Sequence, residues 1–400
     1  MNNKKQKLVP ELRFPEFENN WNIVRLKDVS TYFNGKSFEG NVQAKGNYEL
    51  ITLKSIDTVG NLVHSNRFIN DKVPTLAKGT LVMILSEQAP GLLGMTAIIP
   101  EENKYVLNQR VAEIRPNNKV ESYFLSKAIN SNQAYFSRLG AGMKVQNISK
   151  PNVENYEFGI PIIAEQQKIA NCLSSLDEVI TAETKKLDLL QDHKKGLLQQ
   201  LFPAEGETQP KFRFPEFVND GDWEEKELED VCNIYNNRRK PISSSKREKG
   251  NYPYYGASGI IDYVKNFIFD ERLLLIGEDG AKWGAYEKTA FIVEGKYWVN
   301  NHAHVLEPTL IDDKLLENFL VKIDIHPFIT GAAPPKLTLN NLKKIPVPVP
   351  PSVKEQQKIA KCLSSVDDLI DAQSKKIQAL KKHKKGLMQR LFPKVNSLTI

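Results

Sequence analysis

An internal duplication constrains the fold of this 400-residue chain more than any other feature. The string RFPEF occurs at Arg13–Phe17 and again at Arg213–Phe217, and a tryptophan follows each copy, Trp21 and Trp223. A longer copy relates residues 165–203 to residues 355–393, and 25 of these 39 positions are identical. Self-similarity of this extent indicates that one structural plan is used twice. We therefore predict two modules, each built from RFPEF, a variable body and a long segment that ends in LFP.

The copied segments 165–203 and 355–393 are predicted to be helices. Their apolar residues recur every three to four positions, and polar residues fill the gaps in this seam at Glu183, Lys194, Gln373 and Lys384. A seam of this period on a helix of about 35 residues, roughly 50 Å long, is typical of a coiled coil. The alternative is one separate surface helix on each module. Packing of the two helices against each other is favoured, because otherwise each apolar seam would have to be buried by some other part of the protein.

The order of the parts is circular. The first long helix leads within ten residues to the second RFPEF, and the second helix ends close to the C-terminus, while the first RFPEF lies close to the N-terminus. We expect a pseudo-twofold arrangement of the α+β class, with two globular α/β domains separated by an antiparallel coiled coil. The predicted parts are an N-terminal segment 1–18, domain 1 at 19–163, helix 1 at 164–203, a linker with RFPEF at 204–222, domain 2 at 223–352, helix 2 at 353–393 and a tail 394–400.

Composition favours a folded protein with an acidic partner. Hydrophobic residues make up 40% and charged residues 26% of the chain, and the net charge is +7. The charge is uneven, because residues 1–164 carry +5 and residues 355–393 carry +5, whereas residues 204–354 carry −3. A basic balance suggests nucleic acid, but the case for the second module must rest on local patches.

The sequence gives no sign of a membrane segment or of secretion. No apolar run approaches the roughly 18 residues of a membrane span, and no apolar run follows the N-terminal lysines. Three cysteines cannot form a disulfide framework. We expect a cytoplasmic protein with no membrane contact.

The sequence strings that come nearest to a methyltransferase loop, a phosphate loop and a metal site are each incomplete. The strings APPK at 333–336 and NYPYYG at 251–256 do not fit the loop with which adenine methyltransferases hold a flipped base. Gly35-Lys36-Ser37 lacks the earlier glycine of a phosphate loop. His302-x-His304 lacks a third metal ligand nearby. We predict no catalytic residues and no metal site.

At the duplicated stretch P-x-x-x-EQ-x-x-I, which leads into a long helix ending in LFP after two dissimilar bodies, the chain resembles the specificity subunit of type I restriction–modification systems. The resemblance implies that each body reads one half of a bipartite site in duplex DNA, that the helices set the gap, and that the chain recruits two modification subunits and restriction subunits. It also implies that S-adenosylmethionine, ATP and Mg²⁺ bind to those partners and that no cofactor binds to this chain.

The resemblance places the assembly surface on the copied helices and their LFP ends. The residues predicted for the subunit interface are Gln166, Ile169, Leu173, Leu176, Leu187, Leu190, Leu201, Phe202, Gln356, Ile359, Leu363, Ile377, Leu380, Leu391 and Phe392.

In the first body, DNA contacts are predicted where strands and a helix-like stretch, 120–139, give way to polar loops. Arginine, lysine and amide side chains read base edges and bind phosphates, and glycine lets a backbone come close. The predicted residues are Gln88, Gln109, Arg110, Arg138, Lys144, Gln146 and Asn147. The alternative for each is a plain surface loop.

In the second body, residues 236–250 carry six basic residues against one glutamate inside a module of net negative charge. This loop is the predicted phosphate contact, with a solvated charge run as the alternative. The predicted residues of this body are Arg238, Arg239, Lys240, Lys246, Arg247, Tyr254, Tyr255, Ser258, Lys282, Asn301, His302 and Lys336.

Two other functional classes remain open from the residues alone. One is a fused enzyme that cuts or methylates DNA by itself, which the missing motifs disfavour. The other is a coiled-coil scaffold that does not bind DNA.

Overall fold

The computed structural model describes residues 8–88, 90–393 and 395. The chain forms two compact units, of which unit 1 comprises residues 1–182 and 377–400 and unit 2 comprises residues 183–376. Each unit contains one body and part of each long helix, α5 (Ile163–Leu201) and α9 (Val353–Leu391). The boundaries between the compact units therefore lie within both long helices.

Unit 1 is built around a four-stranded antiparallel sheet with the order β2-β9-β5-β7. The apolar run LVMI of β5 is fully buried, which fits its place inside the sheet. A three-stranded sheet, β4-β3-β8, and two pairs, β1–β11 and β10–β6, complete the body. The strands are β1 (Asn22–Arg25), β2 (Ser30–Asn34), β3 (Tyr48–Ile51), β4 (Phe68–Ile69), β5 (Leu81–Ile84), β6 (Ser86–Glu87), β7 (Thr96–Ile98), β8 (Tyr105–Leu107), β9 (Val111–Pro116), β10 (Gln146–Asn147) and β11 (Glu157–Ile160).

The helix-like stretch predicted at 120–139 is two helices. Glu121 caps the first of them by accepting a hydrogen bond from the backbone N–H of Phe124, and Ser131 and Asn132 separate it from the second. The helices of this body are α1 (Leu26–Val29), α2 (Ser122–Asn130), α3 (Gln133–Leu139) and α4 (Lys150–Glu154), with a 3₁₀ turn at Glu39–Asn41.

Unit 2 repeats this plan although its sequence differs. Its main sheet has the order β13-β20-β17-β18, in which the buried run LLLIG of β17 takes the place of β5. A second sheet has the order β15-β14-β19-β16, and β12 pairs with β23 as β1 pairs with β11. The parallel pairing of β14 with β19 corresponds to that of β3 with β8. The two bodies therefore share one topology.

The elements of unit 2 complete the description. Its strands are β12 (Glu224–Glu227), β13 (Cys232–Ile234), β14 (Lys249–Gly256), β15 (Gly259–Val264), β16 (Phe269–Asp270), β17 (Leu273–Gly277), β18 (Ala290–Val293), β19 (Lys296–Val299), β20 (Ala303–Pro308), β21 (Ile329–Thr330), β22 (Lys336–Leu337) and β23 (Pro346–Val349). Its helices are α6 (Leu228–Val231), α7 (Asp313–Lys322) and α8 (Leu339–Lys343), with 3₁₀ turns at Pro215–Phe217, Asn236–Arg238, Ser244–Lys246 and His326–Phe328.

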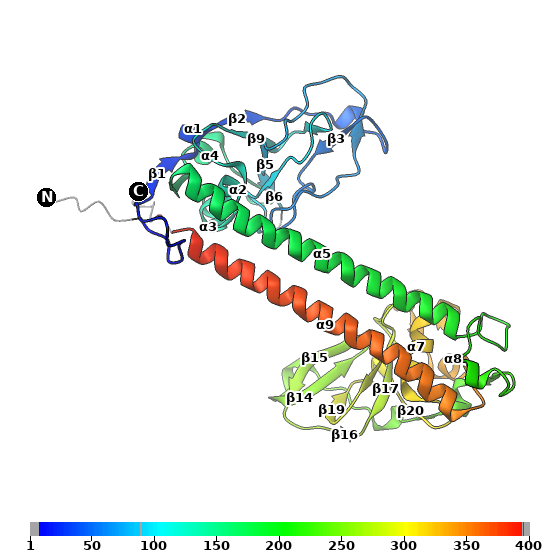
Figure 1. The fold of residues 1–400 in the computed structure, drawn as a ribbon. Helices are drawn as coiled ribbons and strands as arrows, with labels where there is room; N and C mark the ends of the chain where they lie inside the picture. The colour runs from blue at the N-terminus through cyan, green and yellow to red at the C-terminus, as the bar shows by residue number, and fades with distance from the viewer. Residues whose placement is uncertain (1–7, 89, 394, 396–400) are drawn as a thin grey trace. The chain divides into compact units, whose positions relative to one another are not determined.

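Within each unit the two long helices pack antiparallel. In unit 1 the first half of α5 lies beside the last half of α9 (Figure 1), and Lys384 forms an ion pair with Asp177. In unit 2 the equivalent pair is Lys194 and Asp367, whose Nζ and Oδ1 are 2.6 Å apart. The polar residues predicted to interrupt the seam therefore pair across it, and Gln373 likewise donates to the Glu183 carboxylate at 2.6 Å.

Candidate nucleic-acid interface

The RFPEF copies anchor each long helix to its body. Arg13 donates two hydrogen bonds of 2.8 Å to the buried carboxylate of Glu165 at the start of α5. Arg213 makes the same two bonds, also 2.8 Å long, to Glu355 at the start of α9. Each pair raises the arginine pKa through this hydrogen bonding to the carboxylate. The repeated arginine and glutamate therefore serve the fold of each unit.

The glutamine of the repeated EQ pair also has a structural role. Gln166 accepts from the backbone N–H of Glu121 at 2.9 Å and donates to the carbonyl oxygens of Lys119 and Pro161. Gln356 accepts from the N–H of Asp312 at 2.9 Å and donates to Leu310 and Pro350. Both amides thus tie the N-terminus of a body helix, α2 or α7, to a long helix.

The side chains predicted for the subunit interface point largely into the chain itself. Eleven of them are buried: Gln166, Ile169, Leu173, Leu201, Phe202, Gln356, Ile359, Leu363, Ile377, Leu391 and Phe392. The other four, Leu176, Leu187, Leu190 and Leu380, are half-buried. A partner protein could not contact the buried residues without opening a unit. The outer faces of the helices, rather than these seam residues, are accessible for docking.

The turns that follow β8 and β19 hold equivalent places in the two bodies. The N–H of Asn108 donates to the carbonyl of Ile51 at 3.1 Å, and the N–H of Asn300 donates to that of Tyr255 at 3.0 Å. Two residues later, Arg110 and His302 accept from the residues after β5 and β17, at 3.0 and 2.8 Å. The predicted pair Gln109 and Arg110 therefore corresponds to the predicted pair Asn301 and His302.

The glycine-rich loop of the first body lies beside this turn. Gln146 pairs with Glu87 of β6, and Asn147 pairs with Ser86, whose hydroxyl donates to Asn147 Oδ1 at 2.5 Å. In unit 2, Lys336 forms the corresponding bridge to Asp279, which follows β17. The pairings thus bring the predicted loops at 140–147 and 330–338 to the same edge of the two main sheets.

The unit 1 residues at this edge are mostly free to contact a ligand. Gln88, Arg110, Lys144 and Asn147 are exposed, and Gln109 and Gln146 are half-buried. Arg110 adopts a φ of 64°, a left-handed conformation that is uncommon for arginine. Neither Arg110 nor Lys144 forms an ion pair with a carboxylate among the residues that the structure describes. Arg138 is exposed on α3, and no described contact links it to this edge.

The packing around Gly35 accounts for the string Gly35-Lys36-Ser37, which lacks the earlier glycine of a phosphate loop. A Cβ at Gly35 would lie 1.8 Å from the carbonyl oxygen of Asn108, so a side chain cannot fit where β2 meets the β8–β9 turn. The string Gly35-Lys36-Ser37 is therefore part of the packing that holds this turn in place.

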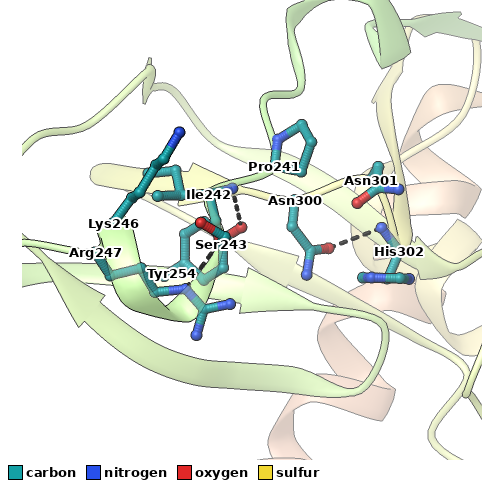
Figure 2. A pocket seen from close by; sticks show the side chains of 9 residues that line it. All are labelled: Pro241, Ile242, Ser243, Lys246, Arg247, Tyr254, Asn300, Asn301 and His302. Carbon is teal, nitrogen blue, oxygen red and sulfur yellow. Dashed lines mark hydrogen bonds between the residues drawn. The ribbon is translucent and has the colours of Figure 1, made fainter.

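In unit 2 the predicted residues converge on an open pocket of about 560 Å³. Figure 2 shows Lys246, Arg247 and Tyr254 on one side of it and Asn300, Asn301 and His302 on the other. Tyr254 accepts a hydrogen bond from the N–H of Ile242 at 2.9 Å, and its ring lies 4.6 Å from the Arg247 guanidinium. Five residues predicted to contact DNA thus line one site, together with Pro241, Ile242, Ser243 and Asn300.

Carboxylates neutralise much of the charge of the 236–250 loop. Arg238 pairs with Glu271 at 2.8 Å, Arg239 with Glu278 at 2.7 Å and Arg247 with Asp262 at 3.2 Å. In the part of unit 2 that the structure describes, Lys240, Lys246 and Lys249 are exposed and have no such partner. Within the predicted loop, these three lysines are therefore the side chains most free to bind a phosphate. Lys249, the first residue of β14, lies in that loop but was not named among its predicted contact residues.

The other predicted residues of unit 2 lie apart from this pocket. Tyr255 packs against Phe291 and Tyr297, and burial raises its pKa. Ser258 is exposed in the β14–β15 turn, and Lys282 is exposed 3.6 Å from Glu287. Lys336 pairs with Asp279 at 3.1 Å, which raises the lysine pKa. These pairings hold Lys336 within the protein's own network.

The histidines near the pocket do not form a metal site. His304 is 1% exposed, and its Nε2 donates to the carbonyl of Leu337 at 2.7 Å while its Nδ1 accepts from Asn236 at 2.8 Å. Burial lowers its pKa, which fits this neutral form. His302 instead faces Asp279. Over residues 8–88, 90–393 and 395, no three histidine, cysteine or carboxylate side chains are placed to hold a metal ion.

Comparison with known proteins places this duplicated fold in a family. The family model for the type I restriction modification DNA specificity domain matches the chain twice, at residues 18–192 and 220–382. The chain therefore belongs to the family of type I restriction–modification specificity subunits. Members of this family are the non-catalytic components of their complexes.

Relatives and solved structures agree with this assignment. A Haemophilus influenzae protein named as a type I restriction enzyme specificity subunit is 40% identical over 145 residues, which make up 36% of the chain and 37% of that protein. The MjaVIII specificity subunit of Methanocaldococcus jannaschii is 22% identical over 95% of the chain and 93% of its own length. The crystal structure of the S subunit from M. genitalium has the same fold, with a TM-score of 0.63 at 20% identity over 97% of this chain and all of the other. Among the described helices, none is long and apolar enough to cross a membrane.

Proposed function

We propose that this chain gives a type I restriction–modification complex its DNA specificity, each unit reading one half of a bipartite duplex site. One observation carries the proposal. The two bodies share a topology, yet the equivalent turn displays Gln109 and Arg110 in unit 1 and Asn301 and His302 in unit 2. A common scaffold with different hydrogen-bonding side chains at one place suits the reading of two different half-sites.

The edges around these turns provide both kinds of contact that DNA recognition needs. Lys144 in unit 1 and Lys240, Lys246 and Lys249 in unit 2 are exposed cations that can bind phosphates. The amides beside them can form hydrogen bonds with base edges in the major groove. Affinity would then depend on salt through the lysines, and sequence preference would depend on the turns and loops.

The partners belong to the same proposal. Two modification subunits would dock on the outer faces of the long helices, one at each repeat, and restriction subunits would join that complex. S-adenosylmethionine, ATP and Mg²⁺ would bind to those subunits and not to this chain. The complex would act on DNA in the cytoplasm.

A body exchange tests the proposal directly. Residues 19–160 would be replaced by the first body of another family member, and the chain would be expressed with its modification subunit in cells whose adenine methylation is then sequenced. One half of the methylated motif should change, while the other half stays the same. A motif that changes in both halves, or no methylation by the unaltered chain, would refute the assignment of one unit to each half-site.

Purification of the complex tests the partner count. At saturating modification subunit, the mass of the complex should correspond to two copies per chain. A single copy at saturation would contradict docking at both repeats.

A further inference from the structure

The β14–β15 hairpin of unit 2 places an apolar side chain beside the pocket. Ile261 is 52% exposed, and it is the extra residue of a β-bulge, because Tyr254 pairs with Asp262 and Tyr255 pairs with Ile260. A bulge redirects a side chain out of the regular alternation of a strand. Asp262 lies opposite Tyr254, which lines the pocket, and Ile261 turns to the same face.

Gly256 makes room for this arrangement. A Cβ at Gly256 would lie 3.1 Å from Cγ2 of Ile261 and 3.5 Å from Nδ2 of Asn300. The Ile261 side chain and Asn300 Nδ2 therefore lie close together around the space that a Gly256 side chain would fill. Ile260 lies opposite Tyr255 and so belongs to the other face of the hairpin, although it is similarly exposed at 47%.

The amide of Asn300 has a donor left for a ligand. Its Oδ1 accepts a hydrogen bond from the N–H of His302 at 2.8 Å (Figure 2), which fixes the orientation of the side chain. Within the described part of the chain, Nδ2 makes no hydrogen bond, and it is not among the buried polar atoms that lack a partner. Asn300 is 3% exposed, but it lines the pocket, so Nδ2 is a fixed donor at the pocket wall next to the exposed side chain of Ile261.

We propose that Ile261 and Asn300 form a contact site for thymine, in which Ile261 packs against the C5-methyl group and Asn300 Nδ2 donates to O4. Thymine presents an acceptor and a methyl group side by side at its major-groove edge, and no other DNA base does so. A two-stranded β-ribbon such as β14–β15 fits into the major groove. The proposal rests on the proposed DNA-reading function of unit 2 and names the base chemistry that this unit selects.

Uracil substitution isolates the methyl contact. The complex of the chain with its modification subunit would be titrated with a duplex oligonucleotide that carries the methylated motif. Each thymine in the unit 2 half-site, on either strand, would be replaced in turn by uracil, which keeps O4 and lacks the methyl group. At one position the unaltered complex should bind about four-fold more weakly, as expected for the loss of one buried methyl group.

Two matched variants complete the experiment. Ile261→Ala should bind the thymine and uracil duplexes equally, whereas Ile260→Ala should keep the difference seen with the unaltered chain. Both substitutions remove exposed side chains, and unchanged melting temperatures would verify that both variants fold. A uracil effect that persists in Ile261→Ala, no uracil effect at any position, or a half-site without thymine would overturn the proposal.

Binding of the modification subunit in the absence of DNA shows whether Ile261 contacts DNA or a protein partner. If Ile261→Ala fails to bind the modification subunit without DNA while Ile260→Ala still binds it, then a protein partner covers Ile261 and the thymine contact is wrong. If the unaltered complex binds no duplex at all, the proposed function of the chain fails as well, whereas a uracil-insensitive complex that binds the motif overturns only the thymine contact.

Discussion

Trp21 donates the indole N–H to Glu165 Oε1 at 3.2 Å, on the same buried carboxylate that Arg13 binds. The repeat does not reproduce this bond. In unit 2, Nε1 of the equivalent Trp223 is buried and has no hydrogen-bond partner among the described residues, although Arg213 holds Glu355 as Arg13 holds Glu165. Two nearly identical anchors thus differ by one hydrogen bond to a carboxylate.

This difference predicts that replacing the anchor tryptophan by phenylalanine destabilises the two units by different amounts. Trp21→Phe and Trp223→Phe remove the same atoms from two buried sites, 3% and 2% exposed. Only the first removes a hydrogen bond to a charged group, so Trp21→Phe should destabilise its unit by about 1.5 kcal/mol more than Trp223→Phe does. Denaturant-dependent hydrogen exchange, read separately on α2 and α7, measures both. Equal losses would show that the indole bond contributes nothing.

Lys127 on α2 is the basis of a second prediction, which concerns pH. Its side chain is 4% exposed, and its Nζ lies 3.8 Å from Asp177, which also binds Tyr123 and Lys384. Burial, and then the positive charge of Lys384, lower the Lys127 pKa from 10.5 to about 8. The positive charge that Lys127 carries below pH 8 therefore lowers the free energy of unfolding of the folded chain. Between about pH 8 and 10.5 the unfolded chain binds the extra proton, and stability rises with pH.

Replacing Lys127 by methionine should remove this penalty. Asp177 keeps Lys384 and Tyr123 as partners, so the substitution leaves no unpaired carboxylate. Lys127→Met should stabilise unit 1 at pH 7 by about 3 kcal/mol, because the Lys127 pKa falls from 10.5 to about 8 and each pKa unit corresponds to 1.36 kcal/mol; the gain should shrink towards pH 10.5. Melting curves from pH 7 to 10.5 test this, with Lys78→Met at an exposed position as the control. A loss of stability at pH 7 would contradict the prediction.

The long helices could be predicted from the sequence, whereas the contacts of Arg13 and Gln166 that hold them to the bodies could not. The duplication identified both long helices and the polar positions in their seams, because a repeat and a period of 3.5 can be read from the sequence; it did not identify Asp177 and Asp367 as the partners of Lys384 and Lys194. The bond between Arg13 and Glu165 joins residues 152 positions apart, so no local pattern could reveal it. For the same reason Gln166 was predicted to face a partner, whereas it serves the capping of α2.

The candidate DNA-binding residues show the same limit. Loop composition singled out residues 301 and 302 and the 236–250 loop, and the structure brings these segments together at one pocket. It could not foresee that Glu271, Glu278 and Asp262 would neutralise three of the arginines, because those acids come from other strands and turns. Ile261 was also missed, because a bulge is set by strand pairing and not by the residue itself.

A third prediction follows from the closure of unit 1 by the last helix. The N–H of Leu12 donates to the carbonyl of Arg390 at 2.9 Å, just as the N–H of Phe212 donates to that of Gln200. Leu8 and Pro393 both lie near Gly159, because a Cβ there would be 2.6 Å from Leu8 Cδ2 and 3.4 Å from Pro393 Cγ. A short linker should therefore join Pro393 to Leu8 without strain.

A circular permutant tests this closure. Its Pro393 would be linked to Leu8, and its new ends would lie in the exposed segment 204–207, which follows α5. Melting temperature and methylated motif should both be retained, because no packed segment is cut. The same closed chain opened between Lys185 and Lys186, inside α5, should lose stability. Similar behaviour of the two permutants would argue against the closure.

The last prediction concerns the gap between the proposed half-sites, which we expect the two long helices to set. Seven residues would be inserted into α5 after Thr184 and seven into α9 after Ser374, two equivalent positions. Seven residues add about 10.5 Å and two turns of a coiled coil, so the antiparallel seam keeps its register. At about 3.4 Å per base pair, the methylated motif should keep both half-sites and gain about three base pairs between them. The same insertion in α5 alone would misalign Lys194 from Asp367 and should abolish methylation. An unchanged gap in the doubly extended chain would show that the helices do not measure it.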